Sequence, residues 1–385
     1  MKRLAFTSLF FSSGKCVLSP PASVRQIEWS NAAKCNGLLE ESVATRYTRD
    51  MKKRFRFLFL FVVGILCGCG NGKEDATASW CRLPDEAGMR MYAYASAFVT
   101  QNSPRDAGTP GAARASRWLA QEIRRMGLTP IADCWIEDTA FGRQSFCNIY
   151  VDFPGTSGQT IVLGSHYDTK SGIPGFQGAN DGASSTAVLL GLIEHFSQNP
   201  PLIRDTIRFA FFDGEECRSA TYRDDDGLHG STHLARYYGN LLRTQGYSPL
   251  LACIVIDMVG DKDLALEIPR NVSPWLGRAA LKIVQNRKDM PNITLADTFL
   301  IDDHMPFIVQ HLPAINFIDY KYGSAPGRHD YWHTPQDTLD KISADSLHKT
   351  GAFLLALLAR IESDADVPAG LRKTAKDVTD SAPQP

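Results

Sequence analysis

Short apolar segments alternate along this chain with longer segments whose apolar residues recur at helical spacing. The predicted strands are Asn148–Asp152, Ile161–Ser165, Ile207–Phe212, Cys253–Ile256 and Ala314–Phe317. The predicted helices are Ala183–Phe196, Thr232–Leu242, Pro274–Arg287 and Ser343–Ile361. Because most of the strands are apolar throughout and helices separate them, the pattern predicts an α/β fold in which a largely parallel sheet is covered on both faces.

Helical spacing also runs from about residue 85 to Gly127, which is a natural helix end. The segment 363–385 is polar with scattered Pro and Ala residues, which favours a flexible tail. We therefore expect the main folded domain at 85–362, preceded by a tether at 69–84.

The stretch 51–68 has the features of a secretory signal. Basic residues at its start precede an apolar run, Phe57–Leu66, which is too short to favour a membrane span. Cys69 follows a small residue and resembles the lipidated cysteine of a bacterial lipobox, although an ordinary signal peptide containing cysteines would look similar. We expect a lipoprotein on the periplasmic side of a bacterial membrane, the outer membrane, with 1–50 as a mis-assigned start or a disordered extension.

The composition adds a few limits to this interpretation. Of the 385 residues, 44% are hydrophobic and 22% charged, and the formal net charge is −1, so the chain gives no electrostatic reason to expect nucleic acid as a partner. Export permits disulfides, and Cys134 and Cys147 are a plausible pair on either side of a turn. No CxxC spacing suggests a thiolate metal site.

Acidic and histidine residues fall at the ends of predicted strands or in the turns that follow. In chain order they are His166, Asp181, Glu215, Glu216, Asp257 and His333. Taken singly, each has a plain explanation as a turn, a solvated surface or a packing residue. Together they can converge beyond the carboxyl ends of the strands, where ligands bind in open α/β sheets. A set of His, Asp and Glu without thiolates suits zinc.

The motifs around these residues occur in a familiar order. They are HYDT (166–169), GANDGAS (178–184), DGEE (213–216), IDM (256–258) and WHT (332–334). Over roughly Arg105 to Ile342 the chain thereby resembles the co-catalytic zinc aminopeptidase family and its relatives, the glutaminyl cyclases. The resemblance implies a three-layer α/β/α sandwich with a mixed, mostly parallel central sheet, and a zinc-dependent catalytic domain at 85–362.

The resemblance also implies metal ligands. In the aminopeptidases one zinc would lie on His166, Asp181 and Asp257, and the other on Asp181, Glu216 and His333. Glu215 would be the base that activates water. Animal glutaminyl cyclases keep a single zinc, on the equivalents of Asp181, Glu216 and His333.

Three features favour the cyclase over the peptidase. The segment 302–307, DDHMPF, resembles the cyclase motif, and Asp302 could join Asp257 and Glu215 in a hydrogen-bonded carboxylate cluster that serves as a proton shuttle. The alternative is a helix N-cap pair. The long stretch 217–229 resembles a cyclase insertion at the substrate mouth, and Trp332 resembles the tryptophan that walls the cyclase pocket; a solvated loop and plain core packing are the alternatives.

The chain also departs from the animal cyclases. Asn316 replaces a cyclase histidine, and Tyr222 is the nearest aromatic residue to a tryptophan that those enzymes carry after the glutamate pair. We expect Trp332, Asn316 and Ile301 in the substrate pocket.

The sequence thus predicts a glutaminyl-peptide cyclotransferase with one zinc ion, acting on the N-terminal glutamine of peptides or proteins and releasing ammonia. Glu215, Asp257 and Asp302 are its expected catalytic residues. The alternative is a two-zinc aminopeptidase; a non-catalytic binding protein of this fold would be expected to have lost Glu215 or a ligand. Nothing in the sequence predicts an oligomeric state.

Overall fold

The computed structural model describes residues 79–219, 222–223 and 225–372. Its strands are β1 (Ile131–Thr139), β2 (Gly142–Phe153), β3 (Thr160–His166), β4 (Thr206–Phe212), β5 (Leu250–Asp257), β6 (Ala265–Ile268), β7 (Asn292–Leu295) and β8 (Ala314–Ile318). Its helices are α2 (Ala87–Asn102), α3 (Pro110–Arg125), α4 (Ala183–Gln198), α5 (His229–Gln245), α6 (Pro274–Val284), α7 (Met305–Val309) and α8 (Ala344–Glu362), with short 3₁₀ helices η1 (Ser79–Cys81) and η2 (Leu339–Lys341).

The strands form one mixed sheet in the order β1-β2-β4-β3-β5-β8-β6-β7. The central strands β4, β3, β5 and β8 are mutually parallel, so their carboxyl ends lie at the same edge. Strands β1 and β2 form an antiparallel hairpin beside β4, and β6 runs antiparallel to β8. The predicted mixed sheet with parallel central strands is confirmed.

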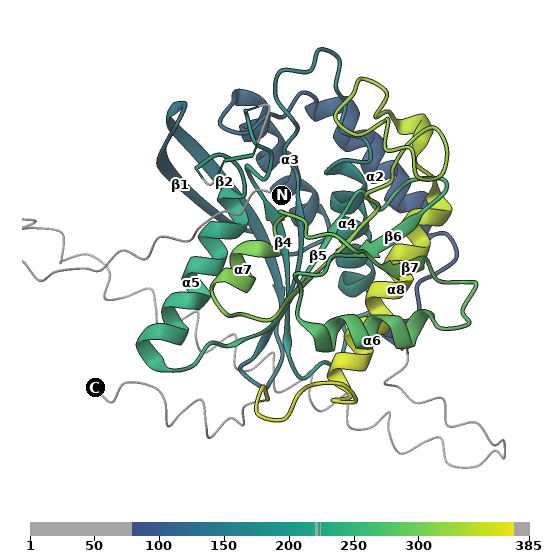
Figure 1. Ribbon diagram of the computed structural model, residues 1–385. Coiled ribbons are helices and arrows are strands. Elements are labelled where there is room, and N and C mark those ends of the chain that lie inside the picture. Colours follow the sequence, from purple (N-terminus) through teal and green to yellow (C-terminus); the bar gives the residue numbers. More distant parts are fainter. Residues whose placement is uncertain (1–78, 220–221, 224, 373–385) are drawn as a thin grey trace, which may run out of the picture. The chain divides into compact units, whose positions relative to one another are not determined.

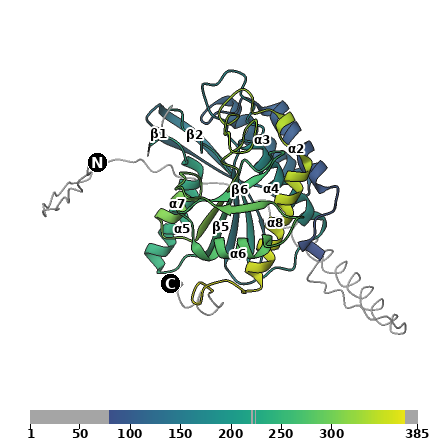
Figure 2. The same ribbon diagram turned by 45° about the vertical axis from the view of Figure 1, so that its right-hand side comes forward.

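Helices cover both faces of the sheet, which confirms the α/β/α layers. Helices α5 and α7 lie on one face, and α2, α4 and α8 lie on the other (Figures 1 and 2). Strand β5 shows why the central strands are apolar throughout: Ile254 and Ile256 join the core beneath α4 and α8, whereas Val255 joins the core beneath α5 and α7. Both faces of the strand are therefore withdrawn from water.

The N-terminal helical segment is two helices rather than one. Helix α2 ends at Asn102, and Pro104, which cannot continue a helix, follows closely. Helix α3 then starts after Thr109, whose side-chain oxygen accepts from the backbone N–H groups of Gly111 and Ala112, with Pro110 in the first turn. Gly127 follows α3 with φ +80°, the left-handed conformation typical of a residue just beyond a helix.

The predicted disulfide is present between Cys134 on β1 and Cys147 on β2, which lie directly opposite each other in the hairpin. The bond therefore links the edge strand β1 covalently to its neighbour β2.

Several N-terminal and C-terminal predictions lie outside the described residues. These are the extension 1–50, the signal 51–68, the lipidated Cys69, most of the tether 69–84 and the end of the tail after residue 372. Among the described helices, none combines the length and the apolar character that crossing a membrane requires.

Candidate metal and catalytic site

The parallel strands bring the predicted site residues to one edge of the sheet. Strand β3 ends at His166 and β5 ends at Asp257, while Glu215 and Glu216 come just after β4. Asp181 lies in the turn that precedes α4. This is the arrangement expected of a ligand site in an open α/β sheet.

One group of possible metal ligands consists of His166, Asp181 and Asp257. His166 Nε2 lies 3.1 Å from Asp257 Oδ1 and 3.2 Å from Asp181 Oδ1. All three residues are buried, and one ligand atom from each lies within 4.8 Å of the others. His166 Nδ1 lies 3.5 Å from Asp168 Oδ1, a contact that orients the ring.

A second group consists of Asp181, Glu216 and His333, again with ligand atoms within 4.8 Å of one another. His333 Nε2 lies 3.0 Å from Glu216 Oε1 and 3.4 Å from Asp181 Oδ2. Asp181 thus belongs to both groups, with one carboxylate oxygen directed to each.

These groups fit a divalent cation such as zinc. Each offers one imidazole and two carboxylates, a donor set that zinc accepts. Asp181 Oδ2 is buried and has no hydrogen-bond partner among the described residues, so a cation would satisfy it. Although burial opposes ionisation, the neighbouring imidazoles of His166 and His333 hold the pKa of Asp181 well below its usual range, which keeps it a carboxylate.

A cavity of about 210 Å³ opens onto the second group. Its lining residues are Lys170, Asp181, Glu215, Glu216, Cys217, Tyr222, Asp257, Met258, Leu300, Ile301, Asp302, Ile318, Tyr320, Trp332 and His333. The predicted catalytic carboxylates of Glu215, Asp257 and Asp302 therefore face the same small space as the metal-ligand candidates.

Burial raises the pKa values of these carboxyl groups. The pKa of Glu215 is well above its usual range because of burial and the nearby charges of Glu216 and Asp302, which outweigh the opposing charge of His166. Burial, then the charge of Asp257, raises the pKa of Asp302 to about 7. Groups that exchange protons near neutral pH are suited to general acid and base catalysis.

Asp302 has a hydrogen-bond partner that the sequence analysis did not predict. The side-chain hydrogen bond of Asp302 comes from Asn316, whose Nδ2 donates to Asp302 Oδ2 at 2.6 Å. Asn316 is fully buried and is absent from the described cavity lining, so it supports Asp302 instead of contacting a substrate. The N-cap alternative for this acidic pair does not hold, because helix α7 is capped at His304 with no side-chain capping bond.

Aromatic rings form one wall of the cavity. Trp332 stacks on His333, with ring centroids 3.8 Å apart, and His329 stacks on the other side of Trp332 at 4.8 Å. Tyr222 and Ile301 add side chains that are 41% and 53% exposed, so the cavity mouth is largely apolar. Tyr222 lies in the long segment after Glu216, which therefore borders the cavity.

Sequence reasoning missed the residues that support the ligands. Asp168 accepts hydrogen bonds from the backbone N–H groups of Glu215 and Glu216, at 3.0 and 3.2 Å. The HYDT motif contains Asp168, so its position beside His166 was a usable signal. Arg105 and Asp337, which bind the turn that carries Asp181, have no such signal in their spacing.

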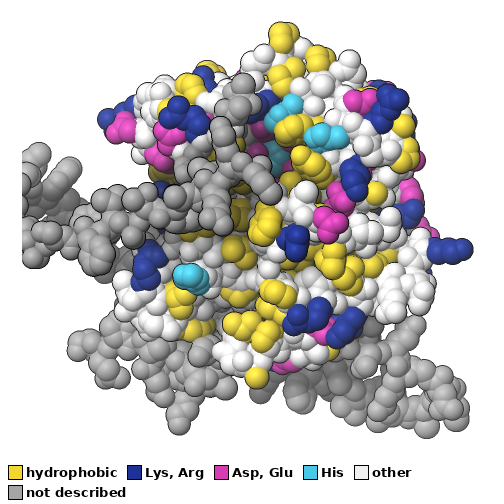
Figure 3. Space-filling model, viewed as in Figure 1, with side chains coloured by type: hydrophobic (Ala, Val, Ile, Leu, Met, Phe, Trp, Pro, Cys, Tyr) yellow, Lys and Arg dark blue, Asp and Glu magenta, His cyan; other side chains and the backbone are white. Residues whose placement is uncertain are grey.

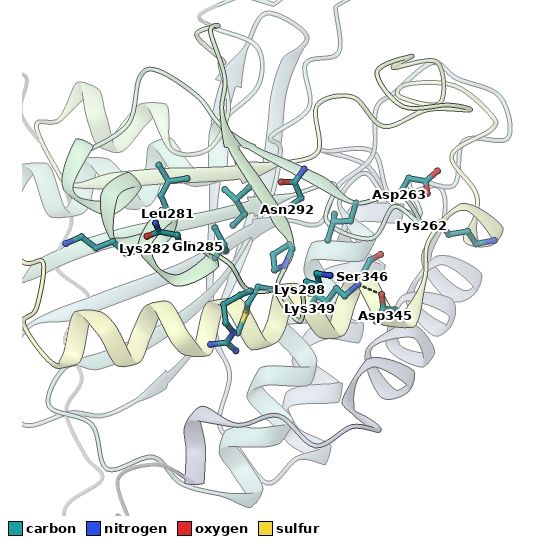
Figure 4. Close-up of a pocket in the computed structure, with 16 residues that line it drawn as sticks. Lys262, Asp263, Leu281, Lys282, Gln285, Lys288, Asn292, Asp345, Ser346 and Lys349 are labelled. Carbon is teal, nitrogen blue, oxygen red and sulfur yellow. Dashed lines mark ion pairs between the residues drawn. The ribbon is translucent and has the colours of Figure 1, made fainter.

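A larger hollow of about 820 Å³ lies between α6, β7 and α8. Its basic residues do not converge: Lys262 and Lys282 point away from each other at opposite ends of the view in Figure 4, and Lys349 pairs with Asp345 at 2.7 Å. On the face shown in Figure 3, described Lys and Arg side chains are interspersed with Asp and Glu. Among the described residues, the metal-ligand candidates and the predicted catalytic carboxyl groups lie together at the smaller cavity.

The chain is similar to curated enzymes of animals. It is 26% identical over 281 residues to the glutaminyl-peptide cyclotransferase of Bos taurus, which covers 63% of this chain and 75% of that protein. It is 24% identical over 283 residues to the glutaminyl-peptide cyclotransferase-like protein of Mus musculus, covering 66% and 71%.

Solved structures give the same picture. A glutaminyl cyclase from an Acidobacteriales bacterium matches with a TM-score of 0.65 and 29% identity, covering 77% of this chain and 100% of that one. A Zn-dependent exopeptidase from Parabacteroides distasonis shares the fold, with a TM-score of 0.58 and 23% identity over 72% of this chain and 99% of that one. Residues 148–358, more than half of the sequence, match Peptidase family M28, and the chain therefore belongs to that family.

Proposed function

We propose that this protein is a zinc-dependent glutaminyl-peptide cyclotransferase, which converts the N-terminal glutamine of peptides to pyroglutamate with release of ammonia. The named similarity to glutaminyl cyclases supports this activity. The observation that carries it is the placement of Asp302 with Glu215 and Asp257 around one small cavity. Such a set of buried carboxyl groups suits a proton shuttle within a closed substrate pocket.

Asp181, Glu216 and His333 are the residues that would hold the zinc ion. When bound there, zinc acts as a Lewis acid that polarises the γ-carboxamide of the substrate glutamine. Lys170 Nζ lies 3.9 Å from Glu216 Oε2 and steadies this carboxylate from the opposite side.

Glu215 is the group that moves protons in this proposal. As the neutral α-amino group attacks the γ-carbonyl carbon and forms the new C–N bond, the Glu215 carboxylate takes one proton from the α-nitrogen. The resulting carboxylic acid then donates its proton to the departing nitrogen, so that the bond from carbon to ammonia breaks and Glu215 is a carboxylate again. Asp257 and Asp302 line the same cavity and steady the transferred proton.

The cavity wall favours cyclisation over hydrolysis. Trp332 and Tyr222 present aromatic surface beside the metal-ligand candidates, and Ile301 adds an aliphatic side chain. Packing of the glutamine side chain against these groups would exclude water, which is the competing nucleophile. It would also hold the α-amino group close to the γ-carbon, where proximity supplies much of the rate.

A two-zinc aminopeptidase remains the second candidate because the other ligand group is complete. His166, Asp181 and Asp257 are buried and close enough to hold a second ion. If both groups held an ion, Glu215 would be placed to act as the base that activates water for peptide hydrolysis.

We also propose that the protein is an exported bacterial lipoprotein anchored at Cys69, because a basic start, an apolar run and a cysteine after a small residue occur together at 51–69. In a bacterial host, Cys69→Ala should move the protein from the membrane fraction to the soluble periplasmic fraction. Retention of the variant in the membrane would contradict the anchor.

Ammonia release tests the proposed activity. Purified protein with zinc should release ammonia from Gln-Phe-Ala and not from Asn-Phe-Ala, whose shorter side chain cannot close the same lactam ring. Removing zinc with a chelator should stop the release, and adding zinc should restore it. Equal release from both peptides, or none from the glutamine peptide, would contradict the proposal.

A further inference from the structure

A buried arginine, Arg105, donates hydrogen bonds to the backbone of the turn that carries Asp181. The guanidinium of Arg105, which is 0% exposed, donates to the backbone carbonyls of Gln177 at 2.7 Å and Gly178 at 2.8 Å. It also donates to the carbonyl of Tyr167 at 2.5 Å and to that of Asp181 itself at 3.3 Å. Apart from Ser103 Oγ, at 3.1 Å, the acceptors of its guanidinium lie on the two segments that carry His166 and Asp181.

The carboxyl group of the buried Asp337 accepts hydrogen bonds from the backbone N–H groups of the same turn. Asp337 accepts from the backbone N–H of Asn180 at 2.7 Å and from that of Asp181 at 3.0 Å. Tyr322 donates its hydroxyl to Asp337 at 2.9 Å, and both side chains are 0% exposed. The N–H and the C=O of Asp181 are thus each bound to a buried ionisable side chain.

Burying two ionisable side chains beside one turn lowers the stability of the fold unless hydrogen bonds offset the loss of water. Among the described residues no ion pair within 4.0 Å joins Arg105 to a carboxylate. The guanidinium of Arg105 and the carboxyl group of Asp337 are instead hydrogen-bonded to backbone groups and to the hydroxyls of Ser103 and Tyr322. Burying charges without a direct partner is unfavourable, and hydrogen bonds to peptide dipoles must compensate. The hydrogen bonds of Arg105 and Asp337 converge on the segment Gln177–Asp181, and one more reaches Tyr167 beside His166.

The turn itself has little freedom to move. Gly178 has φ +55° and Gly182 has φ +81°. A Cβ at Gly178 would lie 2.9 Å from Arg105 Nη2 and 2.7 Å from the carbonyl oxygen of Asp181. The arginine therefore packs tightly into the turn, and a shift in either would displace the other.

We propose that Arg105 and Asp337 are positioning residues for metal binding, which fix the turn so that the two carboxylate oxygens of Asp181 face the two ligand groups. The inference rests on the zinc site of the proposed function. It concerns affinity for the ion and does not depend on whether the enzyme cyclises or hydrolyses. Residues that orient metal ligands through such contacts typically contribute about tenfold to hundredfold to affinity.

The test measures zinc affinity by competition with a chromophoric chelator. Asp337→Asn, which keeps the shape but replaces one of the two acceptor oxygens with an NH2 group that cannot accept, should weaken zinc binding about tenfold to hundredfold. Tyr322→Phe should weaken zinc binding less than Asp337→Asn does. Arg105→Met should weaken zinc binding, and the zinc affinity of Arg105→Lys should lie between those of wild type and Arg105→Met. Excess zinc should restore turnover to Asp337→Asn, which a general folding defect would not allow.

Arg208→Met is the matched control. Arg208 makes a bidentate pair with Asp152, at 2.8 and 2.7 Å, near the start of β4 and away from the site. Its loss should lower thermal stability and leave zinc affinity unchanged. If Arg105 variants do not fold, Asp337→Asn and Tyr322→Phe still decide the matter.

The measurements distinguish failure of the positioning role of Arg105 and Asp337 from failure of the proposed zinc site. Wild-type zinc affinity in both Asp337→Asn and Tyr322→Phe would overturn this inference alone. Absence of zinc binding in the wild-type protein would overturn it together with the proposed metal site.

Discussion

The indole of Trp332 stacks on the imidazole of His333, with 3.8 Å between ring centroids and 19° between ring planes. His333 adopts φ +52°, a left-handed conformation that few non-glycine residues adopt, and its ring contacts Trp332 on one face and Glu216 through Nε2. One side chain therefore both walls the cavity and orients a metal-ligand candidate.

Replacing Trp332 should weaken metal binding as well as substrate binding. Loss of a ring stack costs about 0.5–1.5 kcal/mol, so Trp332→Ala should reduce zinc affinity about two- to tenfold. It should also raise KM for a glutamine peptide. Trp332→Phe keeps a ring against His333 and should stay close to wild type in zinc affinity. Equal zinc affinity in Trp332→Ala and wild type would show that the stack does not orient His333.

Glu215→Gln should abolish turnover and spare the metal. The amide cannot exchange a proton, so kcat should fall about 10²- to 10⁴-fold. Zinc affinity should remain near wild type, because Glu215 belongs to neither ligand group. Stopped assays for ammonia, with zinc content measured on the same samples, check both expectations. Activity within about threefold of wild type would remove Glu215 from the proton step.

Asn316 should set the pH range of activity. Its hydrogen bond to Asp302 favours the ionised carboxylate and partly offsets the burial that raises the pKa of Asp302 to about 7. Asn316→Leu removes this bond, so that pKa should rise further. If ionised Asp302 is needed, the acidic limb of the kcat/KM profile should move to higher pH, with a greater loss at low pH than at high pH.

Asn316→His is the control for that profile, because histidine retains a donor at the same position. Its acidic limb should move less than that of Asn316→Leu. An unchanged limb in Asn316→Leu would mean that Asp302 does not control the profile.

The disulfide should matter for stability and not for chemistry. Replacing Cys134 and Cys147 together by serine should lower the free energy of unfolding by about 2–4 kcal/mol, because the unfolded chain regains freedom. The bond lies in the β1–β2 hairpin at one edge of the sheet, so kcat/KM should change little at low temperature. Denaturant unfolding with and without reductant measures the effect; a difference below about 0.5 kcal/mol would contradict it.

The strands that position the site were predictable because they are buried on both faces. Strand β5 is buried along its whole length and reads as an unbroken apolar run. Strand β1 lies at the edge, with alternating exposed and half-buried residues, and β6 and β7 span only four residues each. Strand β1 therefore lacks a clear apolar face, and β6 and β7 are too short for a repeating pattern to be recognised.

The metal-ligand candidates were also predictable, because His166 and Asp257 fall at strand ends. Their supports were not: Arg105 precedes α3 and Asp337 lies in a turn, and only tertiary packing brings both to Asp181. Asn316 was assigned to the substrate pocket because it stands where the animal cyclases carry a histidine, although its side chain points to Asp302. Periodicity locates a strand and does not say which buried partner a polar side chain meets.

The central claim is that the N-terminal glutamine is cyclised and not removed. Mass spectrometry of Gln-Phe-Ala and Leu-Phe-Ala, each incubated with purified protein and zinc, tests it directly. The glutamine peptide should lose the mass of ammonia and keep its residues, while the leucine peptide stays intact. Release of the first residue from either peptide would contradict the cyclase and identify an aminopeptidase.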